Sequence, residues 1–568
     1  MIKRLAGCIR QYKRDTVLTP LFMLGEVSCE CVIPLLTAEL INNIQAGCSM
    51  NVILQFGLKL FLVAMLSLAC GSASGWFCAS AAAGFAQNLR RDLYYKVQDF
   101  SFKNIDHFST SGLVTRMTTD ITNVQMAYMM SIRLLARAPI MILLSWIMTL
   151  LINVKIALLF LIVIPLLGGT LMFIAKKAHP HFIRVFDEYD ELNNSVQENV
   201  NASRVVKAFV REDYEINKFH GVSNYVYTLF TKAEKIVAWN SPVLQFMMYA
   251  VVLLIALIGG RSIVFGTMET GELTSVIVYA IQILMSLNMV TFVFVMIMIA
   301  GASTDRITEV LNEVPEMQDK ADAVKEVRNG EITFEHVDFS YAGEGGNLSL
   351  KDINLHIKSG QTVGIIGGTG SAKSTLVQMI PRLYDVTGGA VKVAGVDVRD
   401  YNLEVLRDQV SMVLQKNVLF SGTIYDNIRW GNEHASDEEV KRVCRLAQAD
   451  GFVNEFPNGY ETMIVQGGNN VSGGQKQRLC IARALLKKPK ILILDDSTSA
   501  VDTKTDALIR KAFREEIPDT TKIIIAQRVS SKMPIRSLCW MMVRSQVWEH
   551  RKNCCRQMRS TGKYMNLR

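Results

Sequence analysis

A glycine-rich stretch in the second half of the chain has the residue types needed to hold phosphate. It consists of Gly367, Gly368, Thr369, Gly370, Ser371, Ala372, Lys373, Ser374 and Thr375. The apolar run 363–366 predicts a strand before it, and the periodic segment 376–380 predicts a helix after it. Backbone N–H groups in such a loop can surround phosphate, and the helix N-terminus adds positive partial charge. The stretch therefore predicts a nucleotide-binding site.

Three residues of this loop have individual expectations. Lys373 would reach the β- and γ-phosphates of a nucleotide, and the Ser374 hydroxyl would bind Mg²⁺. Ala372 replaces one glycine of the usual pattern. Because Ala372 stands at the start of the predicted helix, we expect helical backbone angles there, and these leave room for a methyl group.

Composition divides the chain into two unlike halves. With 568 residues the chain is too long for one core, and its long apolar runs lie within residues 1–300. The formal net charge is +9. Because much of this charge lies beside apolar runs, we expect membrane lipids as partners and no nucleic acid. The 11 cysteines form no zinc-type CxxC pairs, which favours reduced or buried thiols over a disulfide framework.

Six apolar runs in the first half are long enough to cross a bilayer. They cover residues 16–44, 52–86, 128–151, 156–175, 240–265 and 275–300. Lys and Arg precede the first run and follow the second and fourth, whereas the loops 45–50 and 266–271 contain neither. By the positive-inside rule, both termini are cytoplasmic.

Two polar segments between these spans, 87–127 and 176–239, still have helical character. Unstructured stretches of this length are unusual in a compact protein, so we favour helices that continue from the bilayer into the cytoplasm over solvated loops. Short transverse helices would join each pair, and the candidates are residues 102–108 and 209–219.

Two acidic residues lie within the first span. Glu26 and Glu30 are four residues apart and therefore share one helix face. Charges at this depth usually face a bundle interior or a water-filled cavity, so the pair could form part of a cavity for a cationic substrate. The alternative is hydrogen bonding to neighbouring helices or a position near the membrane interface.

The second half contains further polar residues at the ends of predicted strands. Tyr341 follows the alternating residues Phe334, Val337 and Phe339, and Asp495 and Asp496 follow the apolar run 491–494. Gln527 follows the apolar run 523–526. Between these lie Gln415 and the segment Ser472, Gly473, Gly474 and Gln475.

The order and spacing of these motifs resemble the ATP-binding cassette (ABC) transporter family. The resemblance extends to about residue 531, and six spans followed by one cassette resemble a half-transporter of the multidrug and lipid exporter type. It implies an α-helical transmembrane domain, with spans that extend into the cytoplasm, followed by an α/β P-loop nucleotide-binding domain. The expected boundaries are 1–301 for the transmembrane domain, 302–328 for a linker and 329–531 for the cassette.

The resemblance also implies ATP and Mg²⁺ as cofactors and a role for each motif. Tyr341 would stack on adenine, and the loop 367–375 would hold the phosphates. Asp495 would hold Mg²⁺ together with Ser374, and Gln415 would sense the metal and the attacking water. The signature segment would bind the γ-phosphate of ATP on a second subunit, through Ser472, Gly473, Gly474 and Gln475. One copy of each motif therefore implies a dimer.

Two departures from the family pattern favour a heterodimer. Exporters that hydrolyse ATP well have glutamate where this chain has Asp496, and histidine where it has Gln527. Aspartate withdraws the carboxylate by about one bond length, and a general base must come within about 3 Å of its proton. Gln527 cannot shuttle a proton. The chain would therefore have a weakly hydrolytic site of its own and supply its signature to a catalytic partner; the alternative is a slow homodimer.

The last residues do not resemble a cassette. From about Lys532 the sequence has clustered Cys, Arg and Trp without a clear period. If residues 539–543 are written as codons and read two bases on, the result is Leu-Asp-Asp-Gly, and residues 553–555 give Leu-Leu. We therefore interpret 532–568 as an aberrant, frameshifted tail, in the gene or in its sequencing. Such a chain would lose native pairing of its last strands and expose Trp540, Trp548 and Cys554.

These observations predict an ATPase that exports hydrophobic or amphipathic small molecules, of the multidrug type, across a bacterial plasma membrane. A lipid flippase or peptide exporter of the same architecture is the first alternative. A non-transporting nucleotide sensor at the membrane and a nonfunctional product of a frameshifted gene are the others.

Overall fold

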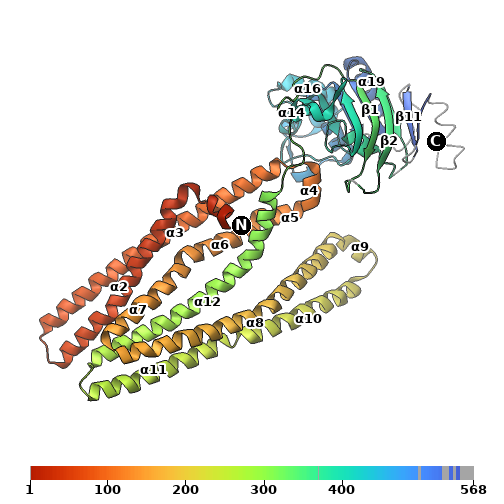
Figure 1. Cartoon of the computed structure of the whole chain (residues 1–568). Coiled ribbons are helices and arrows are strands. Elements are labelled where there is room, and N and C mark those ends of the chain that lie inside the picture. The colour runs from red at the N-terminus through yellow and green to blue at the C-terminus, as the bar shows by residue number, and fades with distance from the viewer. Residues whose placement is uncertain are drawn as a thin grey trace. The chain divides into compact units, whose positions relative to one another are not determined.

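The chain forms two compact units. The computed structural model describes residues 2–343, 345–368, 370–496, 501–526, 536–541 and 545–550. The helical unit comprises Met1–Gln98 and Ser109–Glu313, and the sheet unit comprises Asp99–Phe108 and Val314–Arg568. Figure 1 shows the whole chain.

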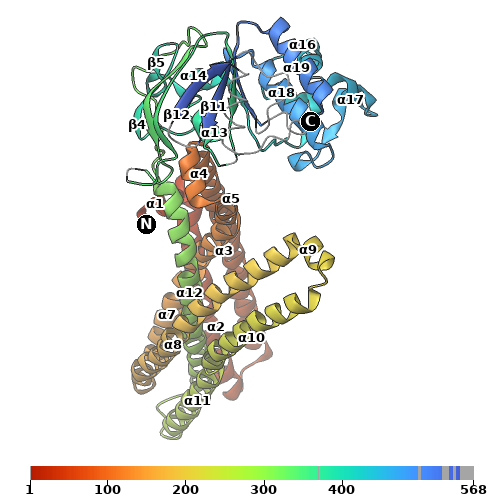
Figure 2. The ribbon, with the colours of Figure 1, turned by 90° about the vertical axis from the view of Figure 1, so that its right-hand side faces the viewer.

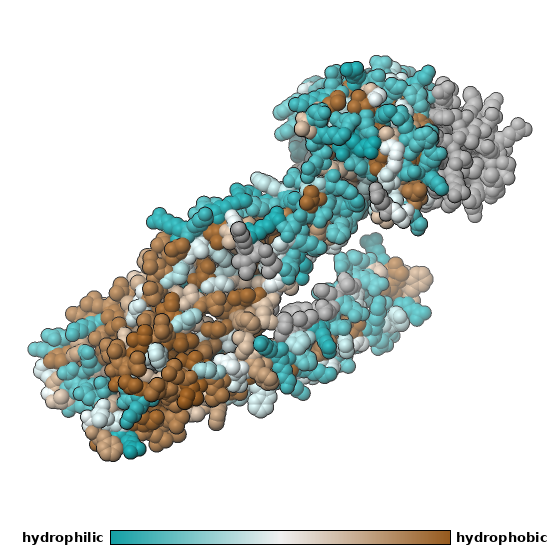
Figure 3. Space-filling view, viewed as in Figure 1, coloured by the Kyte–Doolittle hydropathy of each residue, from teal (hydrophilic) through white to brown (hydrophobic). Residues whose placement is uncertain are grey.

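Six long helical stretches of the helical unit are apolar enough to cross a membrane, which confirms the six predicted spans. They are Arg10–Gln45, Met50–Gln98, Thr110–Ile152, Val154–Phe182, Glu212–Val264 and Thr270–Asn312. In Figure 3 their hydrophobic side chains form a broad brown zone on the visible face. Many large apolar side chains there are exposed, as expected for residues that contact lipid.

The helices of this unit follow one another with short breaks. They are α1 (Ile2–Gly7), η1 (Arg10–Tyr12), α2 (Lys13–Gln45), α3 (Met50–Gln98), α5 (Thr110–Thr115), η2 (Arg116–Asp120), α6 (Ile121–Met130), η3 (Ser131–Leu135), α7 (Ala136–Ile152), α8 (Val154–Asn201), α9 (Ser203–Ala208), α10 (Glu212–Val237), α11 (Asn240–Val264) and α12 (Thr270–Asn312). The turns η2 and η3 are π-helical. Helices α3, α8 and α10 continue through the polar segments, so these segments contain helices, as predicted.

Only the first of the two predicted short connecting helices has the expected bounds. It is α4 (Phe102–Phe108), which belongs to the sheet unit. The prediction of a second one at 209–219 is wrong, because the short helix is α9, and α10 begins at Glu212 (Figures 1 and 2). The chain reverses at Val210, whose φ is +52°. Glu212, Asp213 and Glu215 then stabilise the N-terminus of a new helix.

The sheet unit contains two larger sheets. The six-stranded sheet has the order β12-β11-β3-β10-β9-β6, and an antiparallel sheet has the order β2-β1-β4-β5. The first comprises β3 (Thr362–Ile366), β6 (Val410–Val413), β9 (Ile491–Asp495), β10 (Thr521–Ala526), β11 (Arg536–Met541) and β12 (Ser545–His550). The second comprises β1 (Ile332–Phe339), β2 (Leu350–Ile357), β4 (Gly388–Val393) and β5 (Val396–Asp397). Strands β7 (Gly422–Thr423) and β8 (Met463–Ile464) pair separately.

Helices cover both faces of the six-stranded sheet. They include α13 (Lys373–Gln378), α14 (Leu403–Gln409), α15 (Ile424–Arg429), α16 (Asp437–Leu446), α17 (Asp450–Glu455), α18 (Gly473–Leu486) and α19 (Thr503–Glu516). Alternate residues of β9 belong to different cores: Ile491 and Ile493 pack with β1 and α13, whereas Leu492 and Leu494 pack with α18 and α19. Burial on both faces explains the continuous apolar run before Asp495.

The sheet continues into the segment interpreted as frameshifted. Strand β11 pairs in parallel with β3 from Arg536 opposite Val363 to Cys539 opposite Ile366, and β12 pairs with β11. The expectation that the last strands lose their pairing is therefore wrong for 536–541. Any segment without proline can pair with the backbone at the edge of β3, whatever its side chains. Residue 554 lies outside the described part of the chain, and the frameshift itself stays a prediction.

Candidate nucleotide-binding site

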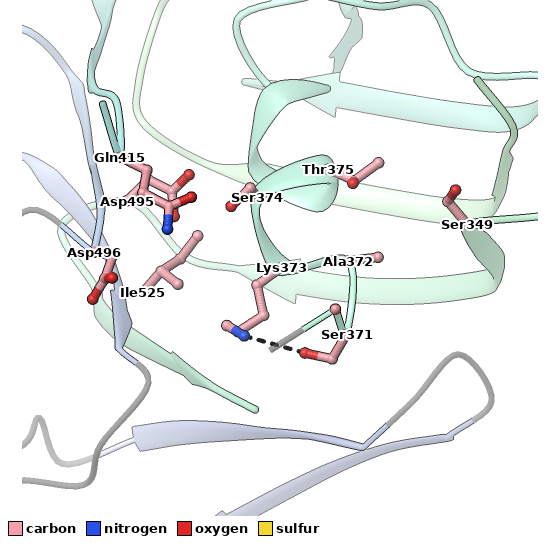
Figure 4. A pocket seen from close by; sticks show the side chains of 11 residues that line it. Ser349, Ser371, Ala372, Lys373, Ser374, Thr375, Gln415, Asp495, Asp496 and Ile525 are labelled. Atoms are coloured by element: carbon pink, nitrogen blue, oxygen red, sulfur yellow. Dashed lines mark hydrogen bonds between the residues drawn. The ribbon is translucent and has the colours of Figure 1, made fainter. Parts of the chain in front are cut away.

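A cavity of about 320 Å³ lies where the parallel strands of the sheet unit end. Its lining residues come from the loop after β3, from α13, from the ends of β6, β9 and β10, and from the residue before β2 (Figure 4). They are Ser349, Gly370, Ser371, Ala372, Lys373, Ser374, Thr375, Gln415, Asp495, Asp496 and Ile525. Carboxyl ends of parallel strands meet at one edge, so distant sequence motifs converge there.

The Lys373 side chain lies folded against the glycine-rich loop. Its Nζ donates hydrogen bonds to the carbonyl oxygens of Gly367 at 2.9 Å and Gly368 at 2.7 Å, and to Ser371 Oγ at 3.2 Å. Burial lowers the pKa of this ammonium, while the carboxylates of Asp495 and Asp496 oppose the shift. Within the described part of the chain Lys373 Nζ bonds only to neutral oxygens. Such a buried cation is suited to receive an anion such as phosphate.

Ala372 does not have the predicted helical backbone. Its φ is +59° and its ψ is +26°, in the left-handed region, and it caps the N-terminus of α13 without a side-chain hydrogen bond. The loop makes a sharp reversal before the helix starts, as the φ of +80° at Gly370 also shows. The methyl group of Ala372 therefore occupies a conformation that glycine adopts more easily.

Asp495, Ser374 and Gln415 offer oxygen atoms for a metal ion. Asp495 ends the buried strand β9, and burial raises the pKa of its carboxyl group. A hydrogen bond from Ser374 and the charge of Lys373 oppose this shift, whereas the neighbouring Asp496 adds to it. A buried carboxylate and a hydroxyl are ligands that suit Mg²⁺, which keeps several water or phosphate ligands of its own.

Asp496 follows β9 directly and lines the same cavity. Its φ is +48°, a left-handed conformation that aspartate tolerates better than most residues. Its charge acts on both Lys373 and Asp495. The acidic pair predicted from the sequence is therefore brought together with the phosphate loop.

Tyr341 lies next to the site but does not line the cavity. Its ring is 48% exposed, and its hydroxyl lies 3.1 Å from Thr375 Oγ1. The ring packs edge-on against Phe339 and Tyr384, at centroid distances of 4.8 and 5.3 Å. Tyr384 and Ser349 were not predicted from the sequence, because neither belongs to a periodic pattern.

The signature segment lies apart from the cavity. Ser472 caps α18 by accepting a hydrogen bond from Gln475 N, and Gln475 Oε1 accepts one from Ser472 N. Gly473 and Gly474 form the first turn of α18, and none of these four residues lines the cavity. The structure therefore does not bring the signature to the phosphate loop of the same chain. Thr369 and Gln527 lie outside the described residues.

Glu26 and Glu30 are paired in the helical unit. Arg137 donates hydrogen bonds to Glu26 Oε1 at 2.6 Å and to Glu30 Oε2 at 2.7 Å. Bonding to a neighbouring helix, the alternative to an open acidic pair, is thus present. Arg137 was not predicted from the sequence, because it is 107 residues from Glu30 and shares no local pattern with it.

Comparisons with known proteins agree with this arrangement. Residues 17–287 match the family described as the ABC transporter transmembrane region, and residues 350–499 match the family described as ABC transporter. YfiB of Bacillus subtilis, an ABC transporter ATP-binding protein by name, is 36% identical over 513 residues, or 90% of this chain and 89% of YfiB. The chain belongs to the ABC transporter family.

Two other relatives of this ABC transporter have names that state a substrate. An ATP-dependent lipid A-core flippase of Desulfotalea psychrophila is 33% identical over 78% of each chain. A fatty acid ABC transporter ATP-binding/permease protein of Mycobacterium bovis is 32% identical over 78% of this chain and 70% of its own. This chain joins a membrane domain to one ATP-binding domain, the organisation of an exporter half-transporter.

Proposed function

We propose that this ABC transporter is one subunit of a heterodimeric exporter of hydrophobic or amphipathic compounds in a bacterial plasma membrane. In this proposal it binds ATP and Mg²⁺ at a weakly hydrolytic site and supplies its signature to the catalytic site of a second half-transporter. Both termini are cytoplasmic in this arrangement. The residue that carries the proposal is Asp496.

Asp496 stands at the position of the expected general base. A carboxylate that is one methylene shorter than glutamate lies about 1.5 Å farther from a bound water, and a general base must approach within about 3.2 Å. Lys373, Ser374 and Asp495 have the chemistry to bind phosphate and Mg²⁺. The groups that would bind phosphate and Mg²⁺ are present, while the expected general base is an aspartate. This combination supports ATP binding with slow hydrolysis.

Two surfaces of the chain support a partner subunit. The N–H groups of Ser472 and Gln475 bond within the cap of α18, and the exposed Gly473 between them offers its backbone N–H group to an anion on another molecule. At the end of the α8–α10 hairpin, Phe209 is 74% exposed and Val210 is 82% exposed. Apolar side chains at the tip of a polar hairpin favour burial against a second protein.

The relatives' names favour an amphipathic substrate. Lipid A-core and fatty acids both combine an apolar tail with a charged group. The mechanism that fits is alternating access: ATP closes two cassettes, the cavity between the spans opens outward, and hydrolysis at the partner's site resets the complex. In it, Lys373 would orient the phosphates, Ser374 and Asp495 would hold Mg²⁺, and Tyr341 would support the adenine ring.

The test compares ATP hydrolysis by the chain alone and with a half-transporter encoded beside it. We expect little activity alone and strong activity in the complex, abolished by Ser472→Ala. In the chain alone, Asp496→Glu should raise the turnover rate at least about tenfold, since a placed general base contributes about 10² or more. The control is Asp408→Glu, the same change on an exposed residue paired with Lys487. Strong hydrolysis by the unsubstituted chain alone would overturn the degenerate-site proposal.

A further inference from the structure

Four charged side chains lie close together in the membrane-spanning part of the helical unit. Glu26 and Glu30 are on α2, Arg137 is in the first turn of α7, and Arg133 is in the π-helical turn η3 before it. Helix α2 packs against α3, η3 and α7. Ionised groups at membrane depth are costly, and those that persist commonly mark the path of a substrate. Single π-helical turns are also frequent at functional sites.

Pairing within this group is incomplete. Arg137 bridges Glu26 and Glu30, so one guanidinium faces two carboxylates and a negative charge remains. Glu26 Oε2 is buried without a hydrogen-bond partner. Among the described residues, Arg133 forms neither a salt bridge nor a hydrogen bond. The group thus has one excess anion and one unpaired cation.

Two glycines of α3 show how far apart these charges lie. A Cβ atom at Gly71 would lie 3.0 Å from Glu26 Cδ, and one at Gly75 would lie 3.5 Å from Arg133 Nη1. Residues four apart are separated by about 6 Å along a helix axis. The excess negative charge and the unpaired guanidinium therefore face the same side of α3, about one helical turn apart.

We propose that these residues bind the headgroup of a zwitterionic amphiphile. Arg133 would bind its phosphate, and the Glu26–Glu30 pair would bind its ammonium group. This inference rests on the proposed export function and narrows its substrate class. An anionic headgroup would be repelled by the excess carboxylate, and a cationic headgroup by Arg133; a headgroup with both charges on a short linker complements both.

The test uses three amphiphiles with the same tail: dodecylphosphocholine, dodecyl phosphate and dodecyltrimethylammonium. Binding of radiolabelled dodecylphosphocholine to the full-length chain is measured in dodecyl maltoside, with the other two as competitors. We expect dodecylphosphocholine to bind at least about tenfold more tightly than either competitor, since each competitor lacks one of the two charged contacts. This ranking needs no substituted chain. Equal affinity for all three headgroups would overturn the proposal.

Substitutions assign the contacts. Arg133→Gln should weaken the binding of dodecylphosphocholine and dodecyl phosphate but not that of dodecyltrimethylammonium. Glu26→Gln should weaken the binding of dodecylphosphocholine and dodecyltrimethylammonium but not that of dodecyl phosphate. The control is Lys59→Gln on α3, whose ammonium lies over the Phe56 ring and outside the group. Equal loss of all three ligands in both variants would mean a structural role and reject the site.

Two further comparisons are needed. The first distinguishes a membrane lipid from a soluble ligand, and the second distinguishes failure of the headgroup site from failure of the export function. Competition by lysophosphatidylethanolamine supports a membrane lipid as the occupant, and competition only by tail-free phosphocholine supports a soluble compound. The binding assay uses no ATP and therefore does not depend on transport. If the three ligands rank as expected but the complex transports nothing, the proposed headgroup site stands and the proposed export function fails. If the complex transports a substrate but the three ligands do not rank as expected, the proposed export function stands and the proposed headgroup site is rejected.

Discussion

Two non-glycine residues at the nucleotide cavity have left-handed backbones, Ala372 with φ +59° and Asp496 with φ +48°. For an alanine this conformation costs about 1 kcal/mol relative to glycine. In the proposed function this loop surrounds phosphate, so the cost would oppose the conformation that binds nucleotide. Asp496 combines such a backbone with a shortened side chain, and both features limit where its carboxylate can lie.

Ala372→Gly should therefore stabilise the phosphate loop. We expect a gain of about 0.5–1 kcal/mol in the free energy of unfolding of the sheet unit, and ATP affinity that rises about two- to fivefold. Denaturant unfolding and nucleotide titration measure the two quantities. The control is Ala394→Gly, at φ +50° between β4 and β5, away from the cavity. It should reproduce the gain in stability without changing ATP affinity; equal effects on affinity would contradict the argument.

Within the sheet unit, helix α4 packs against the aromatic side chain of Tyr384. Tyr384 donates a hydrogen bond to Asp106 Oδ2 at 2.7 Å, and its ring lies 6.1 Å from Phe102 and 5.3 Å from Tyr341. Burial and the bond to Asp106 both raise the pKa of Tyr384, so the hydroxyl stays protonated near neutral pH. One ring thus contacts both α4 and the residue expected to stack on adenine.

Tyr384→Phe should keep the packing of this ring and lose the hydrogen bond. In the assembled transporter we expect near-normal basal ATP hydrolysis but substrate stimulation reduced about two- to tenfold, since such a bond contributes about 1 kcal/mol. Asp106→Asn should have a similar effect. The double variant should be no worse than either single one if the two residues act through one bond; additive losses would contradict this.

The helices and strands were predictable where the pattern was local. The run before Asp495 predicts a strand because both its faces are buried, and the glycine-rich loop predicts the strand and helix around it. The start of α10 at Glu212 was missed because the positive φ at Val210 is a backbone property with no strong residue signal. Arg137 and Tyr384 were missed because their partners are distant in the chain, and only packing brings them together.

At the scale of the whole molecule, the chain has surfaces that favour contact with a second subunit. The signature residues lie apart from the chain's own cavity, and the tip of the α8–α10 hairpin exposes apolar side chains. Neither feature stabilises an isolated subunit. Both are consistent with a chain that is complete only beside a second half-transporter.

Phe209→Asp should weaken assembly with the partner. Placing a charge where an apolar side chain becomes buried commonly costs more than 2 kcal/mol, so co-purification of the two subunits should fall by at least about tenfold. Tyr227→Asp is the control, since Tyr227 is 66% exposed along α10 and lies away from the tip. Unchanged co-purification of Phe209→Asp would exclude the tip from the interface.

The membership of α4 in the sheet unit has a consequence for biosynthesis. Asp106 and Tyr384 are 278 residues apart. At about 5–20 residues per second, the ribosome completes α4 roughly 15–55 s before its partner surface exists. Membrane insertion of the early spans can therefore precede this contact, and a translation product that stops short of Tyr384 leaves Phe102 uncovered. Closure of this junction reports that synthesis has passed Tyr384, roughly two thirds of the way along the chain, which makes α4 a natural point for cellular quality control to inspect.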